Sequence, residues 1–90
     1  MLNIRYSNAF KKDYQAILKR GYNPCLLQNI LVLLCEQQPL PPKYKDHKLS
    51  GNYAGFRECH ITPDWLLIYK VEQDILTLSL TRTGTHSDLF

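Results

Sequence analysis

The sequence predicts an α+β fold with the element order β-α-α-β-β-β, in which a helical hairpin packs on one face of a mainly antiparallel sheet. Two observations predict it. Apolar residues recur at helical spacing in two segments of the first half, and they alternate or run continuously in three segments of the second half. The chain has 90 residues, the size of one small domain, so we expect residues 1–90 to form a single domain.

The first half is predicted to hold one short strand and two helices. Residues 2–6 alternate apolar and polar side chains, as a strand with one buried face does. In residues 10–18 apolar side chains recur at helical spacing, and Ser7 or Asn8 can cap that helix. A second helix is expected to start at Asn23-Pro24, with the asparagine as its cap and the proline in its first turn.

The second half is predicted to form a three-stranded antiparallel meander. The proline-rich run 39–42 ends the second helix, and residues 43–51 are expected to form an exposed polar loop. The segment 65–71 is nearly all apolar, which is typical of a central strand. The pattern leaves open whether the N-terminal strand pairs parallel or antiparallel. The strands of the meander are expected at residues 53–61, 65–71 and 76–81.

Composition excludes several classes of protein. No apolar run reaches the roughly 20 residues that span a bilayer, and the N-terminus lacks signal-peptide features, so we expect a cytoplasmic protein with no membrane partner. Three cysteines do not suit a disulfide scaffold, and no Cys-x-x-Cys pair indicates zinc. We therefore expect Cys25, Cys35 and Cys59 to be small buried or half-buried apolar residues.

The positive charge is concentrated in the first half of the chain. The net charge is +3. Residues 1–48 hold eight lysines and arginines against three acidic residues, whereas residues 49–90 are net acidic. A basic half predicts a polyanionic partner, either nucleic acid or an acidic protein, with a merely solvated surface as the alternative.

Polar residues gather at predicted strand ends on one rim of the sheet. His60 ends one strand, and Asp64 opens the next after a tight turn. Arg82 ends the third strand, which runs parallel to the first and therefore emerges at the same rim. Arg82 shares its parity with the leucines of its strand, so only a β-bulge would take it off the buried face. Two further histidines flank this meander, His47 and His86.

These residue types suit cleavage of an RNA phosphodiester bond. A general base must deprotonate the 2′-hydroxyl and a general acid must protonate the 5′-oxygen, and histidine serves both roles near neutral pH. Arginine holds the phosphate as charge develops, and rings such as Trp65 and Phe90 can stack on an unpaired base. For Trp65 the alternative is a place in the core, which is usual for a tryptophan that begins a buried strand. The histidine spacing matches no compact metal-ligand motif. A Cys59–His60 nucleophile pair is excluded, because adjacent strand residues point to opposite faces.

Several segments resemble the YafQ branch of the RelE superfamily of bacterial type II toxin–antitoxin toxins. The similarity covers essentially the whole chain, including its length and element order. The segments that carry it are Tyr44-Lys45-Asp46-His47, Phe56-Arg57-Glu58-Cys59-His60, Pro63-Asp64-Trp65 and Arg82-Thr83-Gly84-Thr85-His86, with Leu89-Phe90 at the end.

The resemblance implies an mRNA interferase, that is, an endoribonuclease that cuts mRNA in the ribosomal A site without a metal or other cofactor. It also implies a cognate antitoxin from the same operon. The antitoxin neutralises the toxin, and operator DNA is bound only through the antitoxin. Within the implied site, His86 is the base or acid and Arg82 holds the phosphate. The catalytic positions that the resemblance implies are His47, His60, Asp64, Arg82 and His86, and the substrate-binding positions are Trp65, Phe90, Lys45 and Arg57.

A non-catalytic basic module that binds RNA or an acidic protein is the alternative function. Binding alone does not require Asp64 among the phosphate contacts, so the polar rim favours the enzyme.

Overall fold

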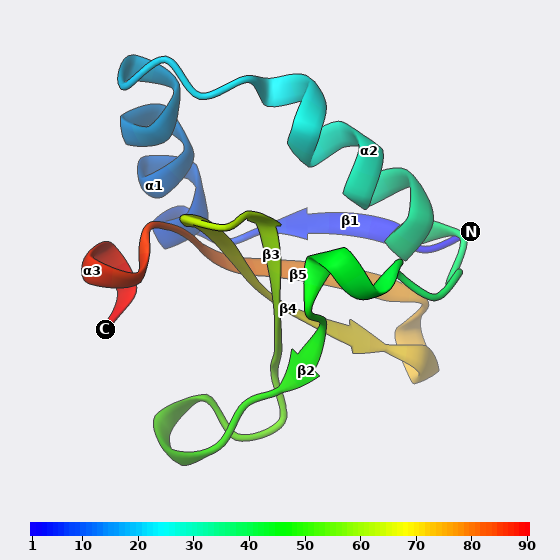
Figure 1. The fold of residues 1–90 in the computed structure, drawn as a ribbon. Coiled ribbons are helices and arrows are strands. Elements are labelled where there is room, and N and C mark those ends of the chain that lie inside the picture. The colour runs from blue at the N-terminus through cyan, green and yellow to red at the C-terminus, as the bar shows by residue number, and fades with distance from the viewer.

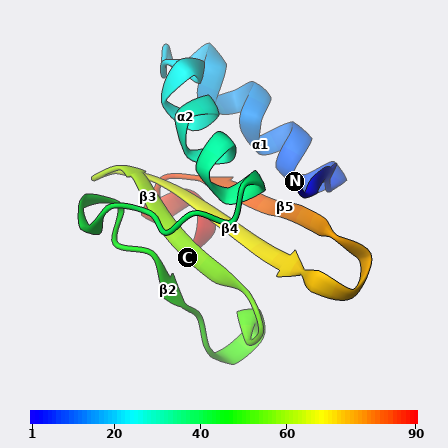
Figure 2. The ribbon, with the colours of Figure 1, turned by 90° about the vertical axis from the view of Figure 1, so that its right-hand side faces the viewer.

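The fold, described by a computed structural model over residues 1–90, has two layers (Figure 1). Helices α1 (Asn8–Lys19) and α2 (Pro24–Cys35) cover one face of a five-stranded sheet, as Figure 2 shows from the side. The other face carries only short segments. The predicted α+β class, with a helical hairpin on a mainly antiparallel sheet, is confirmed.

The sheet is antiparallel except at one edge. Its order is β1-β5-β4-β3-β2, and β1 pairs parallel to β5, which decides the pairing that the sequence left open. The polar loop expected at residues 43–51 contains a short strand of its own, β2. The first meander strand starts four residues later than predicted, because Gly51–Tyr53 forms a turn of 3-10 helix. The strands are β1 (Asn3–Tyr6), β2 (His47–Lys48), β3 (Arg57–Thr62), β4 (Trp65–Glu72) and β5 (Thr77–Gly84).

Both long helices begin at the predicted caps. The Ser7 hydroxyl accepts a hydrogen bond from the Phe10 N–H at 2.9 Å, and the Asn23 side chain accepts one from the Cys25 N–H at 3.0 Å. Each bond satisfies a backbone donor that the first helical turn leaves unpaired. Gly21 follows α1 with a φ of 88°, a conformation that favours glycine. None of the helices is sufficiently long and apolar to cross a membrane.

The main core lies between the helices and the inner face of the sheet and contains 15 buried residues. Cys35 and Cys59 belong to it, as expected. Cys25 does not, because it lies in the first turn of α2 and is exposed, so the expectation that all three cysteines are shielded is wrong.

Trp65 lies in this core and is 0% exposed. Its indole N–H donates to the Thr83 hydroxyl at 2.8 Å, and that hydroxyl donates to the Leu66 carbonyl oxygen at 2.7 Å. These bonds give the buried indole N–H a hydrogen-bond acceptor in place of water. The expectation that Trp65 stacks on a base is therefore wrong, since its ring presents no surface to a ligand.

A smaller apolar cluster lies on the open face of the sheet. Helix α3 (His86–Leu89), which the sequence did not predict, contributes Leu89 to it. Gly84 precedes the helix with a φ of 154°, and an added Cβ would lie 3.0 Å from the Asp88 side chain. Glycine is thus required for α3 to turn back onto the sheet. The other members of the cluster are Leu66 and Ile68, with Leu49, Tyr53 and Phe56 packed against them.

Replacing Thr83 by valine tests the buried bridge. The change keeps the side-chain shape but leaves the Trp65 N–H without its acceptor and removes a donor from the Leu66 carbonyl. We expect the free energy of unfolding to fall by about 1–3 kcal/mol in urea denaturation. Thr81→Val is the control, since the half-buried Thr81 hydroxyl forms no side-chain hydrogen bond. Equal urea midpoints for the two variants would contradict a stabilising role for the Trp65–Thr83–Leu66 hydrogen bonds.

Candidate active site

Two β-bulges place candidate side chains around the open face. The β4–β5 pairing shifts by one residue, so that Tyr69 pairs with Leu80 and Ile68 pairs with Arg82. Leu80 therefore stays in the core while Arg82 turns to the open face, so the bulge that takes Arg82 off the buried face is present. A second shift follows His60 at the end of β3. Bulges re-aim side chains in this way beside many active sites.

Asp13 of α1 holds Arg82. Its carboxylate accepts from Arg82 Nε at 2.6 Å and from one terminal nitrogen at 3.1 Å, and it also accepts from the Thr83 N–H at 3.1 Å. This pairing raises the pKa of the Arg82 guanidinium, with a smaller contribution from the Tyr53 hydroxyl. The second terminal nitrogen forms no hydrogen bond with Asp13. Asp13 was missed from the sequence, since only the fold brings it to Arg82.

Glu58 is the second residue that the sequence-based prediction missed. It is 6% exposed and lies on β3, with Oε1 3.4 Å from His47 Nε2 and 3.9 Å from His60 Nε2. Its other oxygen, Oε2, is buried and has no hydrogen-bond partner. A buried carboxylate with an unpaired oxygen is costly, and such groups concentrate at functional sites. The available signal was the alternation of β3, which puts Glu58 and His60 on one face.

His47 and His60 form a pair around this carboxylate. Their ring centroids are 6.3 Å apart, and His47 lies on β2 rather than in a loop. His47 Nδ1 is 2.7 Å from the carbonyl oxygen of Lys45, a residue with a positive φ of 48°. When Nδ1 carries the proton, this bond fixes the ring with Nε2 toward Glu58. The exposed Lys45 side chain forms no ion pair.

His86 and Phe90 form the opposite side of the open face. Their ring centroids are 5.1 Å apart, and Phe90 also meets the edge of Tyr53 at 6.1 Å. His86 is exposed at the start of α3, and Phe90 is 55% exposed. An exposed imidazole thus lies beside an exposed ring that offers a stacking surface.

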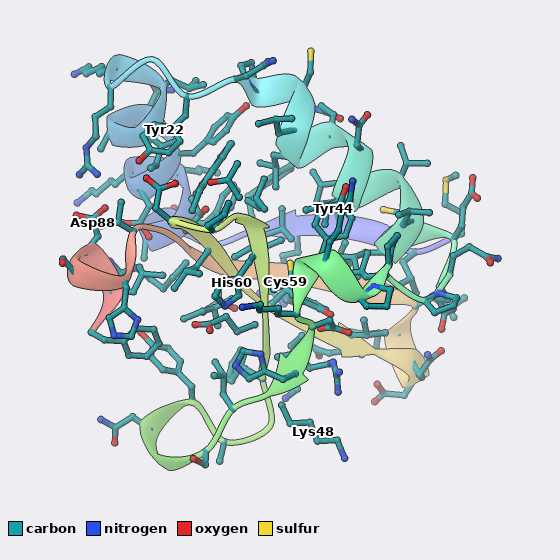
Figure 3. The ribbon with its side chains drawn as sticks, in the orientation of Figure 1. Tyr22, Tyr44, Lys48, Cys59, His60 and Asp88 are labelled. Atoms are coloured by element: carbon teal, nitrogen blue, oxygen red, sulfur yellow. The ribbon has the colours of Figure 1, made fainter.

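Asp88 anchors α3 to α1. It accepts two hydrogen bonds from Arg20, at 2.8 and 3.1 Å, and one from the Thr85 N–H in a capping box. Arg20 and then Thr85 hold the pKa of Asp88 well below its usual range. Arg20 belongs to the basic half of the chain, but its guanidinium is paired with Asp88 of the same chain. Figure 3 shows Asp88 on the same side of the molecule as Tyr22, just after α1.

Asp64 lies on the β3–β4 turn, apart from the other candidates. The hydroxyls of Thr62 and Tyr22 each donate to it at 2.8 Å, and they lower the pKa of its carboxyl. Tyr22 packs edge-on against Trp65 at 5.4 Å, so the buried indole supports the group that orients Asp64. No hydrogen bond or ion pair joins Asp64 to the histidines or to Arg82. The predicted convergence of five groups is thus incomplete.

Two further groups have structural partners. Arg57, expected to bind substrate, donates to Asp46 at 3.2 and 3.0 Å, and the Tyr69 hydroxyl donates to the same carboxylate. Burial raises the pKa of the Cys59 thiol to about 12, which removes it as a nucleophile. No group of three or more histidine, cysteine, aspartate or glutamate side chains has metal-binding geometry.

Replacing Arg20 by glutamine tests how α3 is held. The ion pair is exposed to solvent and therefore contributes little to global stability. We expect faster amide hydrogen exchange at Asp88, Leu89 and Phe90 with an almost unchanged unfolding midpoint. Lys19→Gln, one position away on the same helix, is the control. Unchanged exchange in all three amides would show that α3 is held by its capping box and Leu89 alone.

Comparison with known proteins places this geometry in a family. A sequence model described as "Bacterial toxin of type II toxin-antitoxin system, YafQ" matches residues 2–90. The mRNA interferase toxin YafQ of Escherichia coli K12 is 42% identical over 89 residues, covering 98% of this chain and 95% of the relative. A putative toxin YafQ of Haemophilus influenzae is 33% identical over 91 residues, covering 96% of this chain and 89% of the relative.

Solved structures share the fold. A metal-bound toxin from Helicobacter pylori matches with a TM-score of 0.94 and 47% identity, covering 100% of both chains. YafQ in the E. coli DinJ–YafQ complex matches with a TM-score of 0.89 and 41% identity, covering 100% of this chain and 99% of that one. This chain belongs to the YafQ family of bacterial toxins of type II toxin–antitoxin systems.

Proposed function

We propose that this chain is an mRNA interferase, a ribosome-dependent endoribonuclease that cleaves mRNA in the A site and so inhibits translation. The observation that carries the proposal is the open face of the sheet, where a bulge presents Arg82 alongside His60. Exposed His86 and Phe90 sit on α3, which packs on that same face. The mRNA interferase activity named for the E. coli relative supports it.

The proposed reaction uses the substrate's own 2′-hydroxyl as nucleophile. A base takes the hydroxyl proton, the 2′-oxygen bonds to phosphorus, and the bond to the 5′-oxygen breaks as an acid protonates that oxygen. The products are a 2′,3′-cyclic phosphate and a 5′-hydroxyl. His86 serves as base or acid, and Arg82 stabilises the charge on the phosphoryl oxygens through the nitrogen that Asp13 leaves free.

Glu58 completes this proposal as the group that orients two histidines. Its Oε1 faces Nε2 of both His47 and His60, so it can accept a hydrogen bond from either ring when that Nε2 carries a proton. His60 is the more shielded of the two and lies opposite Leu66 on the open face, which favours it as the proton-transfer partner of His86. His47, tied to the Lys45 carbonyl, then serves to position and to add charge.

The proposed chemistry needs no metal or other cofactor. The H. pylori relative is described as metal-bound, but the donor groups of this chain form no cluster with metal-binding geometry. A histidine pair and an arginine supply proton transfer and charge stabilisation without a Lewis acid. The expected result is that excess chelator leaves cleavage unchanged.

We propose a cognate antitoxin as the protein partner. YafQ of E. coli is found in complex with DinJ, and a similar partner would neutralise this chain and alone contact operator DNA. The ribosome and mRNA are the proposed targets in the cytoplasm, where the basic half of the chain faces ribosomal RNA.

Replacing His86 or Arg82 by alanine tests the catalytic assignment. Loss of a proton-transfer group lowers the rate by about 10²–10⁴, and loss of a charge-stabilising donor lowers it by about 10²–10³. We expect that induced expression of either variant is not toxic and that mapping of mRNA ends finds no cleavage sites. His47→Ala should be milder. Equal toxicity of the parent and all three variants, each folded by circular dichroism, would leave the non-catalytic binding module as the function.

A 2′-O-methyl group at the scissile nucleotide tests the nucleophile. The modification removes the hydroxyl proton that the base must take, so we expect no cleavage in a translation reaction programmed with the modified mRNA. The control carries the methyl group one nucleotide downstream and should be cut normally. Normal cleavage of the modified site would mean that water is the nucleophile and that the roles of His86 and His60 are wrong.

A further inference from the structure

A groove crosses the open face of the sheet beyond the candidate active site. It consists of two hollows, with volumes of about 480 and 290 Å³, that meet at Phe56 and Lys70. The larger hollow runs toward β1 and is lined by Arg5, and the smaller runs toward β2 and is lined by Lys48. Figure 3 shows Lys48 beside β2, the edge strand opposite β1, where it lies opposite Arg57.

Three of the four cations that line the groove are free of carboxylate partners, and the fourth, Arg57, pairs with Asp46. Arg20, Arg57 and Arg82 each pair with an aspartate, but Arg5, Lys48 and Lys70 form no ion pair. The Lys70 ammonium lies 5.5 Å from the centroid of the Phe56 ring. Glu72, the sole carboxylate that lines either hollow, accepts a hydrogen bond from Ser79 at 3.0 Å. The groove thus carries a net positive field.

The groove is continuous with the candidate active site. On β4, Ile68 lies opposite Arg82, and Lys70 lies opposite Ser79. Two residues along a strand span about 7 Å, so Lys70 is close to Arg82 on the same face. At the other side, Phe56 packs edge-on against Tyr53, which packs against Phe90. A strand held at Arg82 can therefore extend directly into the groove.

We infer that this groove binds the phosphate backbone of single-stranded RNA on one side of the scissile phosphate. The inference rests on the proposed function and adds a substrate track to it, with Arg5, Lys48 and Lys70 as the phosphate contacts and Phe56 as the floor. An acidic protein segment would share the charge complementarity. Protein interfaces, however, depend on buried apolar anchors, whereas four cations line this groove against one carboxylate, Glu72.

The test measures how the affinity of the full chain for RNA depends on RNA length and on the charge of the groove. The triple variant Arg5→Gln, Lys48→Gln, Lys70→Gln is titrated with RNAs of three and nine nucleotides, both 2′-O-methylated at the scissile position, with fluorescence anisotropy as readout. We expect at least a tenfold loss of affinity for the longer RNA only. The salt slope should fall by about 0.7 for each phosphate contact removed. The control variant Lys12→Gln, Lys19→Gln removes exposed charges from α1 on the other layer.

Three results would contradict the inference that the groove binds RNA. An equal loss in the control variant would mean that net charge alone binds RNA. An equal loss for both RNA lengths would place the three cations at the scissile phosphate itself. Unchanged RNA affinity with lost binding of an antitoxin peptide would assign the groove to the protein partner. Because binding is measured on uncleaved RNA, these results are distinct from failure of the proposed function, which the His86→Ala cleavage test detects.

Discussion

The one-residue bulge in β5 is the constraint on which the rest of the open face depends. Before it, Leu78 and Leu80 face the core, and after it Arg82 points to the open side. Without the extra residue, a strand of period two would bury the guanidinium among leucines, which is prohibitive for a charged group. The bulge therefore lets a single strand serve both as a core element and as the support of the arginine that we propose holds the phosphate.

The two faces of the sheet satisfy their polar groups to different degrees. On the helix-covered face, the indole of Trp65, the hydroxyl of Thr83 and the carbonyl of Leu66 form a closed chain of hydrogen bonds. On the open face, Glu58 keeps an oxygen without a partner, and the cations Arg5 and Lys70 lack carboxylate partners. The covered layer thus provides stability, whereas the open layer retains groups whose partners would come from a ligand.

The C-terminal segment is positioned by surface contacts rather than by a deep core. Gly84 allows the chain to turn, Leu89 packs on the open face, and Asp88 bonds to Arg20 from the far end of α1. His86 and Phe90 therefore sit on a short helix that is held by its capping box, by Leu89 and by the exposed Arg20–Asp88 ion pair.

The sequence by itself determined the element order, both helix caps, the helical hairpin and the family, because each depends on local spacing or on contiguous motifs. The parity of β5 left two places for Arg82, the buried face or, with a bulge, the open face, and Trp65 could lie in the core or stack on a base. The tertiary structure decided both, and it alone decided the parallel pairing of β1 and the short elements β2 and α3. It also paired Arg82 with Asp13, 69 residues away, and Arg20 with Asp88, 68 residues away. Such pairings follow from which surfaces meet once the layers pack, and a local pattern of residues carries no information about a partner that distant in the chain.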